Sequence, residues 1–323
     1  MSASTATGTI ATARATIRES PPGAPRYRGR FAPSPTGRLH SGSLLAALGS
    51  FLQARSRQGE WLLRVEDLDT PRVVPGAADE IVRTLEHFGF EWDGPIAWQS
   101  QRTSLYVSAV DALLAKNLLY PCSCSRKDLA SASRVSDVDA NDEPYYPGTC
   151  RNGPQRGGVP LALRLRTPDR ELRFTDRLQG DCTCNVGREV GDFVVRRRDG
   201  LHAYQLAVVV DDAEQGVTEV VRGCDLLSST PRQMLLQEAL DLPQPRYLHL
   251  PLLVEADGRK LAKSRHSLPV AAVEASLHLH AALTWLGQQP PADLARSQPA
   301  EVMKWAIGNW DLLPLRDRRE VRL

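Results

Sequence analysis

A run of small, polar and basic residues separates the first strand-like segment from the first amphipathic one: residues 33–42 read Pro-Ser-Pro-Thr-Gly-Arg-Leu-His-Ser-Gly. A helix beginning near Ser41 would present free backbone N–H groups and a partial positive charge, and such helix ends bind phosphates. Gly42 would let a nucleotide approach the backbone closely, and His40 could donate a hydrogen bond to a phosphate. The same residues would also build an ordinary turn, so the run alone leaves both interpretations open.

A second group of candidate residues is Arg259-Lys260-Leu261-Ala262-Lys263-Ser264, which follows a strand-like segment ending near Val254. Lysine is rare in this chain, because only five of its forty basic residues are lysine, yet two of the five fall here. A lysine ammonium is a compact charge on a flexible stem, whereas arginine suits rigid bidentate contacts. We therefore predict that Lys260 and Lys263 bind the phosphates of a triphosphate from a mobile loop. The alternative is an ordinary solvated basic loop.

Three cysteines, Cys122, Cys124 and Cys150, fall within 29 residues of one another. The chain has six cysteines and no secretion signal, which indicates a reducing compartment where metal binding is more common than disulfides. Structural zinc sites prefer four ligands. Cys182 and Cys184 could supply a fourth, and three free cysteines without metal are the alternative.

The elements expected around these residues alternate between strand and helix. Strands are predicted at residues 26–32 and from Trp61 to Val65, and helices from residue 41 and at 76–88 and 102–116. On the first helix apolar side chains recur at spacings of three and four, at Leu44, Leu45, Leu48, Phe51 and Leu52. The order β-α-β-α favours a parallel sheet with helices on both faces, and Glu66 would lie at the carboxyl end of a strand, where such sheets bind ligands.

The pattern changes from about residue 121 to 200, where cysteines, prolines and glycines accumulate and two short strands flank a turn at 198–200. The apolar run at 206–210 is predicted to be a strand buried on both faces and ended by Asp211-Asp212. A helix is predicted from Ser229-Thr230-Pro231, with a hydroxyl cap and proline in the first turn. The α/β sheet therefore resumes after an insertion, and the chain past residue 268 is expected to be helical.

Composition narrows the class of protein. The 323 residues suggest about two folding units, and 42% hydrophobic and 24% charged residues are ordinary for a globular chain. A mainly disordered chain is excluded, and no run approaches the roughly 18 apolar residues of a membrane span. The net charge of +2 does not indicate a nucleic-acid-binding protein, but it does not exclude one that binds through a local basic patch. Residues 1–30 hold five arginines and one glutamate, and we predict a disordered tail there.

Five ordered segments give the chain a recognisable family resemblance. Residues 30–42 resemble the nucleotide-binding signature of class I aminoacyl-tRNA synthetases in its glutamyl form, and Lys-Leu-Ala-Lys-Ser at 260–264 is similar to their second signature. Between them lie Arg-Val-Glu-Asp-Leu-Asp at 64–69, His-Ala-Tyr-Gln-Leu-Ala at 202–207 and Val-Val-Arg-Gly-Cys-Asp-Leu at 220–226. The resemblance covers about residues 28–266 and is strongest to the glutamyl-queuosine tRNA(Asp) synthetases, a truncated branch of the glutamyl-tRNA synthetases.

This resemblance implies an α/β fold: a Rossmann-like parallel sheet with a zinc-bearing α+β insertion and a short helical C-terminal region. The expected domains begin with a disordered tail at residues 1–28 and the first half of the Rossmann fold at 29–120. The zinc-containing insertion follows at 121–203, and the second half of the Rossmann fold, with the lysine signature, at 204–268. A helical region at 269–323 ends the chain. Only about 55 residues follow the second signature, too few for an anticodon-binding domain.

The resemblance also implies the residues of the site. Glutamate carries two carboxylates and an ammonium, which call for cationic clamps and an anion. Its expected contacts are Arg30, Phe31, Ala32, Pro33, Ser34, Glu66, Tyr204 and Arg222. Those of ATP, with Mg²⁺, are His40, Gly42, Lys260 and Lys263, with His40 and Lys263 as the catalytic residues. One structural zinc ion is expected on Cys122, Cys124, Tyr146 and Cys150.

The implied activity is ATP-dependent formation of glutamyl-adenylate and transfer of glutamate to queuosine in the anticodon of tRNA(Asp), by a cytoplasmic monomer that has no membrane partner. The phosphates of the tRNA would contact Arg196, Arg197 and Arg198. Charging of the 3′ end of tRNA(Glu), or a silent RNA-binding relative, are the alternatives. Two positions depart from the signatures: Ser43 stands where many class I enzymes have a second histidine, and Ala262 replaces a serine.

Overall fold

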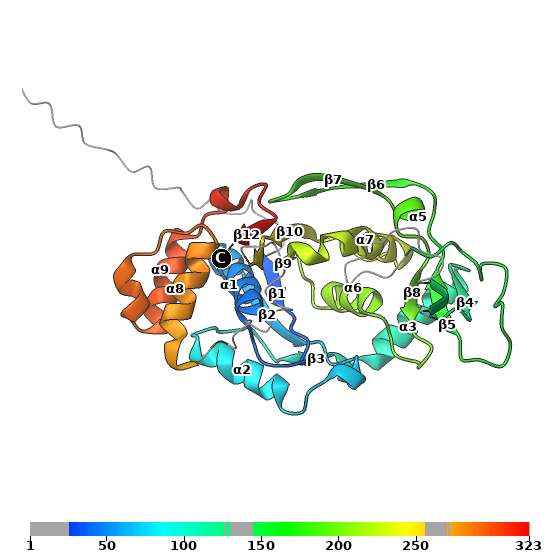
Figure 1. Cartoon of the computed structure of the whole chain (residues 1–323), viewed down its shortest axis with the longest axis horizontal. Helices are drawn as coiled ribbons and strands as arrows, with labels where there is room; N and C mark the ends of the chain where they lie inside the picture. The colour runs from blue at the N-terminus through cyan, green and yellow to red at the C-terminus, as the bar shows by residue number, and fades with distance from the viewer. Residues whose placement is uncertain (1–25, 126, 130–144, 256–269, 271, 323) are drawn as a thin grey trace, which may run out of the picture.

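The computed structural model describes residues 26–125, 127–129, 145–255, 270 and 272–322 (Figure 1). The predicted tail up to residue 25 and the segment with Lys260, Ala262 and Lys263 lie outside the described residues. Among the described residues, no helix is both long enough and apolar enough to span a bilayer.

A parallel sheet lies at the centre of the molecule, as the order of elements predicts. β1 (Arg28–Phe31) pairs with β2 (Glu60–Val65), which pairs with β3 (Ala97–Trp98), both in parallel. β9 (Glu219–Gly223) belongs to a second sheet and lies beside β1, where the N–H of Thr218, just before β9, donates to the Arg28 carbonyl at 2.9 Å. β9 pairs in parallel with β10 (Arg246–Leu250). These contacts therefore bring the first and second halves of the chain side by side.

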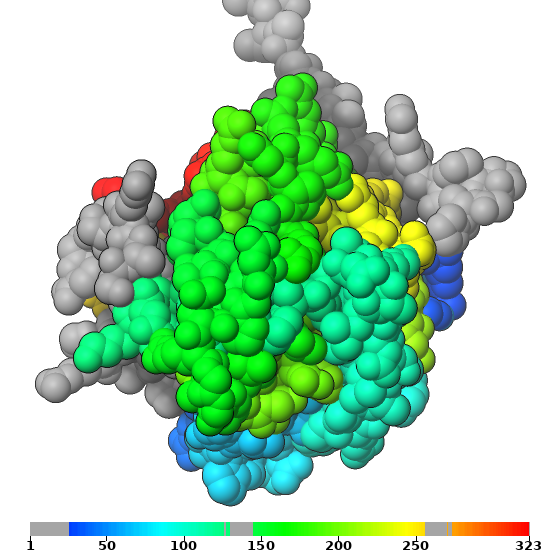
Figure 2. Space-filling view, turned by 90° about the vertical axis from the view of Figure 1, so that its right-hand side faces the viewer, coloured from blue at the N-terminus to red at the C-terminus, as the bar shows by residue number. Residues whose placement is uncertain are grey.

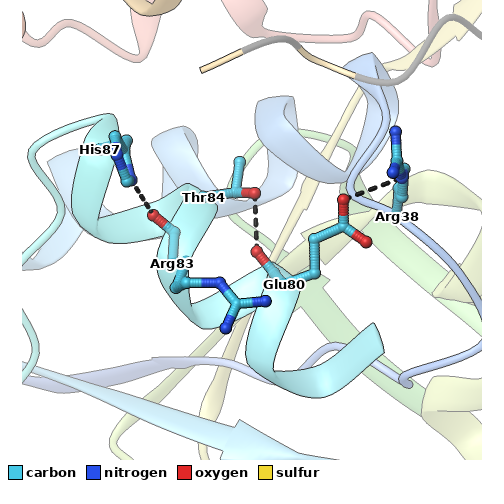
Figure 3. Close-up of a pocket in the computed structure, with 5 residues that line it drawn as sticks. All are labelled: Arg38, Glu80, Arg83, Thr84 and His87. Carbon is cyan, nitrogen blue, oxygen red and sulfur yellow. Dashed lines mark hydrogen bonds and ion pairs between the residues drawn. The ribbon is translucent and has the colours of Figure 1, made fainter. Parts of the chain in front are cut away.

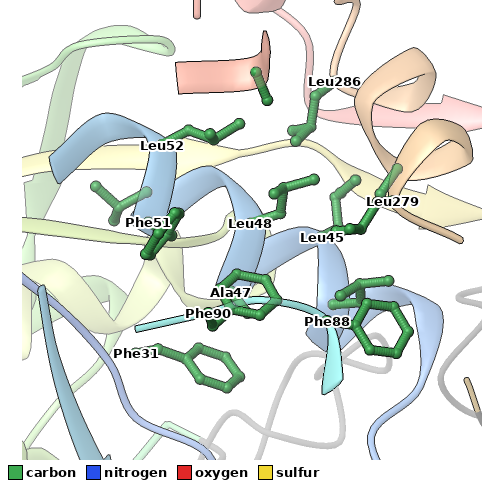
Figure 4. Packing of buried hydrophobic residues seen from close by; sticks show 14 of the residues in the cluster. Phe31, Leu45, Ala47, Leu48, Phe51, Leu52, Phe88, Phe90, Leu279 and Leu286 are labelled. Carbon is green, nitrogen blue, oxygen red and sulfur yellow. The ribbon is translucent and has the colours of Figure 1, made fainter. Parts of the chain in front are cut away.

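Helix α1 (Ser41–Arg55) is the central packing element (Figure 4). It lies against β1, β2 and β9 on one side and against α8 (Ala275–Trp285) and α9 (Pro299–Asn309) on the other. The five apolar residues predicted for its buried face are all buried. Gly49 allows close contact with β10, because a Cβ there would lie 2.5 Å from Leu250 Cδ1. α2 (Ala77–His87) and α3 (Thr103–Ala115) match their predicted positions.

The segment between α3 and α6 forms mostly antiparallel strands at one end of the molecule, where Figure 2 shows it in green. β4 (Leu119–Cys122), β5 (Ala162–Leu165) and β8 (Phe193–Arg196) make one three-stranded sheet. β6 (Glu171–Asp176) and β7 (Gly180–Asn185) form a hairpin followed by the short α5 (Val186–Glu189). β6 also pairs with β10, so the insertion is joined to the central sheet.

The predicted strand at 206–210 is wrong, because these residues form part of helix α6 (Tyr204–Glu214). The helix packs against α3, α7 and β8, so its apolar residues are buried all round and give no amphipathic pattern. A short valine-rich run cannot distinguish a buried strand from such a helix. The sheet resumes instead at β9. In place of a second strand after the turn at 198–200, only a bridge joins His202 to Arg196.

The remaining elements complete the second half of the chain. α7 (Thr230–Ala239) begins where the proline predicts, but the Ser229 side chain makes no capping hydrogen bond. β11 (Leu252–Val254) precedes the lysine segment and pairs with β12 (Glu320–Arg322). Short 3₁₀ turns lie at Thr70–Arg72, Gln99–Gln101, Cys224–Ser229, Ala272–Glu274, Ala292–Arg296 and Leu313–Leu315. Past residue 268 the expected helical character is present in α8 and α9.

Candidate active site

The loop that follows β1 is held against the end of β2. The Glu66 N–H donates to the Pro33 carbonyl at 2.9 Å, which places the first signature beside the Glu66 carboxylate. The Phe31 side chain is buried in the core and stacks on Trp61, with 6.3 Å between ring centroids, so only its backbone is available to a ligand. Ala32 and Pro33 are half-buried and Ser34 is exposed.

His40 occupies the N-cap of α1. Its Nδ1 accepts from the Ser43 N–H at 3.2 Å, which leaves the proton on Nε2, 3.0 Å from the Ser43 hydroxyl. Burial lowers the pKa of His40, so the ring is neutral near pH 7. A Cβ on Gly42 would lie 3.2 Å from the His40 ring, so this glycine also makes room for the cap.

Arg30, Glu66 and Tyr204 lie in one buried cluster below this loop. The Arg30 guanidinium is bidentate on Asp212, at 3.0 and 3.1 Å, and its Nη1 donates to the Val221 carbonyl. Glu66 is 8% exposed, and its Oε1 has no hydrogen-bond partner among the described residues. Burial raises the pKa of Glu66 to about 7, although Arg64 and Arg30 oppose the shift. A buried carboxylate oxygen that accepts no hydrogen bond among the described residues can accept one from a ligand cation.

Asp212 and Arg64 are site residues that the sequence analysis did not identify. Arg64 is fully buried, and its Nη2 donates to Asp212 at 2.8 Å and lies 3.5 Å from Glu66. Burial raises the pKa of Asp212, but the charges of Arg30 and Arg64 outweigh it, so the pKa lies below its usual value. The signal was available: Arg64 stands two residues before Glu66 in its motif, and Asp212 closes an apolar run.

Arg222, at the end of β9, is also buried and hydrogen-bonded. Its Nε donates to His249, its Nη1 to Gln233 and its Nη2 to Thr230 and to the Leu226 carbonyl, at 2.8–3.2 Å. Burial raises the pKa of Tyr204 above its usual value, and the nearby charges of Arg222, Glu66 and Arg30 also act on it. The structure therefore brings together four of the residues that were predicted to bind the substrate glutamate. They come from β1, β2, α6 and β9 and are Arg30, Glu66, Tyr204 and Arg222.

The three clustered cysteines are also brought together. The sulfur atoms of Cys122, Cys124 and Cys150 lie within 4.8 Å of one another, and the Tyr146 hydroxyl is 3.3 Å from Cys122 Sγ and 3.7 Å from Cys124 Sγ. Burial raises the pKa of Cys150, but hydrogen bonds from Tyr146 and from backbone N–H groups lower it to about 6. Cys182 and Cys184, on β7, are not part of this group.

A cation lies beside the cysteine cluster. The Arg164 guanidinium lies over the Tyr146 ring, 4.0 Å from its centroid, and its Nε donates to Cys122 Sγ at 3.3 Å. A positive charge at this position would offset the negative charge of thiolate ligands. The donor set and this cation fit a zinc ion.

The two pockets described in the structure lie outside the glutamate cluster. One, of about 410 Å³, is lined by Arg38 and by Glu80, Arg83, Thr84 and His87 of α2, and Arg38 pairs with Glu80 at 2.8 Å (Figure 3). The other, of about 280 Å³, lies beside Tyr146 and Asp192. Neither is lined by the residues predicted to bind glutamate or ATP.

Two of the three arginines predicted to contact tRNA already have protein partners. Arg197 pairs with Asp69 at 3.0 Å and with Asp199 at 2.6 Å, and Arg198 donates to the Pro160 carbonyl. Their contact with phosphates stays a prediction.

Comparison with known proteins identifies the family. The model of the family "tRNA synthetases class I (E and Q), catalytic domain" matches residues 26–283. A protein of Ectopseudomonas mendocina named glutamyl-Q tRNA(Asp) synthetase is 55% identical over 289 residues, which are 89% of this chain and 94% of the relative. The chain belongs to the glutamyl-Q tRNA(Asp) synthetase family of class I enzymes. The predicted resemblance is therefore confirmed.

Further relatives agree with this assignment. A Chromobacterium violaceum protein of the same name is 54% identical over 286 residues, 88% of this chain and 94% of the relative. The crystal structure of the glutamate-tRNA synthetase from Elizabethkingia anophelis has a TM-score of 0.75 and 26% identity, and the match covers 92% of this chain and 68% of that one. The class I synthetase fold, with its parallel sheet and helices, is thus confirmed as well.

Proposed function

We propose that this protein activates glutamate with ATP and transfers it to queuosine in the anticodon of tRNA(Asp). The observation that carries the proposal is the cluster of Arg30, Glu66, Tyr204 and Arg222, in which one oxygen of Glu66 has no hydrogen-bond partner among the described residues. The names of the relatives supply the acceptor. The cytoplasm, with its tRNA, ATP and glutamate, is the compartment expected for this activity.

The cluster has the charges that glutamate needs. Glu66 would hold the ammonium, Arg30 and Arg222 would each face a carboxylate, and the Tyr204 hydroxyl would add a hydrogen bond. Within the described contacts, Arg30 uses three of its five donor hydrogens and Arg222 uses four, so both retain a free N–H for a ligand. Asp212 keeps Arg30 in place while leaving that donor available.

The activation step needs positioning and charge stabilisation. A carboxylate oxygen of glutamate would attack the α-phosphorus of ATP and release pyrophosphate, and no protein group need form a covalent bond. The N-terminus of α1, capped by His40, lies beside the first signature and would face the phosphates. Lys260 and Lys263, outside the described residues, would add positive charge, and Mg²⁺ would supply further neutralisation.

We also propose one structural zinc ion per chain, held by Cys122, Cys124, Cys150 and Tyr146. The cluster geometry supports this ligand set over one that uses Cys182 or Cys184. Its place next to β4 and β5 would give the ion the role of fixing the long connection between these strands.

The test of activation is glutamate-dependent exchange of pyrophosphate into ATP by RNA-free enzyme. We expect exchange without tRNA, because hydrogen bonds within the protein hold Arg30 and Arg222, the residues proposed to bind glutamate. Exchange that appears only after tRNA is added would contradict pre-assembly of the site. No exchange under either condition would favour a silent RNA-binding relative.

A further inference from the structure

The orientation of Arg222 depends on a histidine in the neighbouring strand. Arg222 and His249 are paired residues in the parallel ladder of β9 and β10, so their side chains lie on the same face of the sheet. Arg222 Nε donates to His249 Nε2 at 3.0 Å. Both side chains are buried, at 5% and 0% exposure.

His249 can accept this hydrogen bond only if its own proton is on Nδ1. Asp176, at the end of β6, favours the tautomer with the proton on Nδ1, because its Oδ2 accepts a hydrogen bond from the His249 Nδ1–H at 2.7 Å. The other oxygen, Oδ1, accepts from the Leu178 and Gln179 N–H groups at 3.0 and 2.9 Å, which fixes the carboxylate. The three residues form a relay across β6, β10 and β9, which are adjacent in one sheet.

A second chain of hydrogen bonds holds the other side of the guanidinium. Gln233 accepts from Arg222 Nη1 at 2.8 Å, and its amide nitrogen donates to Gln205, which in turn donates to Ser229 at 3.0 Å. Arg222 is therefore restrained from two independent directions. Only the His249 side depends on a protonation state, and only that side reaches the insertion through β6.

We propose that His249 and Asp176 are positioning residues for Arg222 in glutamate recognition. The inference rests on the proposed function, in which Arg222 holds a carboxylate of glutamate. His249 supplies the acceptor that fixes the plane of the guanidinium, and Asp176 keeps that acceptor available. Through Asp176 the strand β6 of the insertion contributes to amino-acid binding in the central sheet.

Two substitutions at one position test the acceptor. In His249→Gln the amide oxygen can take the place of Nε2 and accept from Arg222, whereas the shorter side chain of His249→Asn cannot reach. We expect the KM for glutamate in pyrophosphate exchange to rise about ten- to hundredfold in His249→Asn, the effect of losing one hydrogen bond to a charged group. In His249→Gln the KM for glutamate should return most of the way to the wild-type value. The KM for ATP should stay within about twofold of the wild-type value in both variants.

His87→Asn, on the exposed part of α2, is the control for the chemical change and should leave both KM values unaltered. Equal rises in the glutamate KM for His249→Gln and His249→Asn, or a parallel rise in the ATP KM, would show a merely structural role and overturn the inference. Wild-type enzyme without glutamate-dependent exchange would overturn the proposed function, and this inference with it.

A measurement on the wild-type protein covers the case in which His249→Asn does not fold. The ¹⁵N shifts of the His249 ring, assigned by comparison with His249→Gln, report which nitrogen carries the proton. The proposal requires a proton on Nδ1 and none on Nε2. A ring protonated on Nε2 at neutral pH would overturn it, because that nitrogen could not accept from Arg222.

Discussion

Glu66 combines three properties at the scale of a single residue: it is buried, close to Arg64 and Arg30, and without a hydrogen-bond partner for Oε1 among the described residues. Burial raises its pKa to about 7. A carboxyl with a raised pKa is charged above that pH and neutral below it, and only the charged form attracts an ammonium. We therefore predict that the KM for glutamate rises about tenfold when the pH falls from 8 to 6.

Glu66→Gln is the control for this prediction. It should bind glutamate weakly at every pH and remove the pH dependence, because an amide does not titrate in this range. His249 does not interfere with the experiment, since burial lowers its pKa to about 4. A wild-type KM for glutamate that is constant between pH 6 and 8 would contradict the assigned role of Glu66.

For single residues, the sequence predicted which side chains belong to the site better than it predicted their hydrogen-bond partners. Arg30, Glu66, Tyr204 and Arg222 stand in short motifs, and the structure brings them together. Their partners Asp212 and His249 were missed, because the pairs Arg30–Asp212 and Arg222–His249 join residues that are 182 and 27 positions apart. Such pairing is set by strand register and helix packing, which local spacing does not reveal.

At the scale of elements, the close contact between α1 and β10 requires a residue without a Cβ at position 49, and this requirement can be tested. A Cβ there would lie 2.5 Å from Leu250 Cδ1, and Leu250 is 1% exposed, so its side chain would have to shift within the core. We predict that Gly49→Ala lowers the free energy of unfolding, because overpacking costs about 1–3 kcal/mol and exceeds the gain in helix propensity. Chemical denaturation of the two proteins measures the difference.

Gly308, in helix α9, is the matched control. Nothing lies within 4 Å of a Cβ built there, so Gly308→Ala should raise stability by about 0.5–1 kcal/mol through helix propensity alone. A gain in stability for Gly49→Ala as well would show that α1 does not pack as closely on β10 as the structure indicates.

The zinc proposal also belongs to this scale, since it concerns the connection between β4 and β5. We predict one zinc ion per chain by metal analysis, retained in a Cys182/Cys184 double variant and lost in Cys150→Ser. Tyr146→Phe should weaken zinc binding, because the phenol oxygen would be the fourth ligand. Loss of zinc in the double variant with full retention in Tyr146→Phe would contradict the proposed ligand set.

The predictable and unpredictable elements differ in their surroundings. α2 and α3 match their predictions because each has an exposed side that polar residues mark. α1 has no exposed residue, and its prediction rested on apolar side chains recurring at spacings of three and four. α6 was predicted as a strand because burial on all sides removes that signal and because its Val208-Val209-Val210 run has strand propensity. Tertiary packing against α3 and α7 outweighs the propensity.

At the scale of the whole molecule, the insertion and the central sheet form one connected body, because β6 pairs with β10. β10 lies between β6 and β9, and across these three strands Asp176, His249 and Arg222 are linked by hydrogen bonds. A continuous chain of hydrogen bonds therefore joins strand β6 of the insertion to Arg222, the residue proposed to hold a carboxylate of glutamate.

The central claim is that glutamate is transferred to queuosine and not to the 3′ end of a tRNA. The most direct measurement supplies the enzyme with ATP, labelled glutamate and an isolated queuosine-containing anticodon stem-loop of tRNA(Asp), with the guanosine-containing stem-loop as the matched control. The account predicts label on the queuosine fragment alone. Label that appears only on the 3′ end of full-length tRNA(Glu) would contradict it.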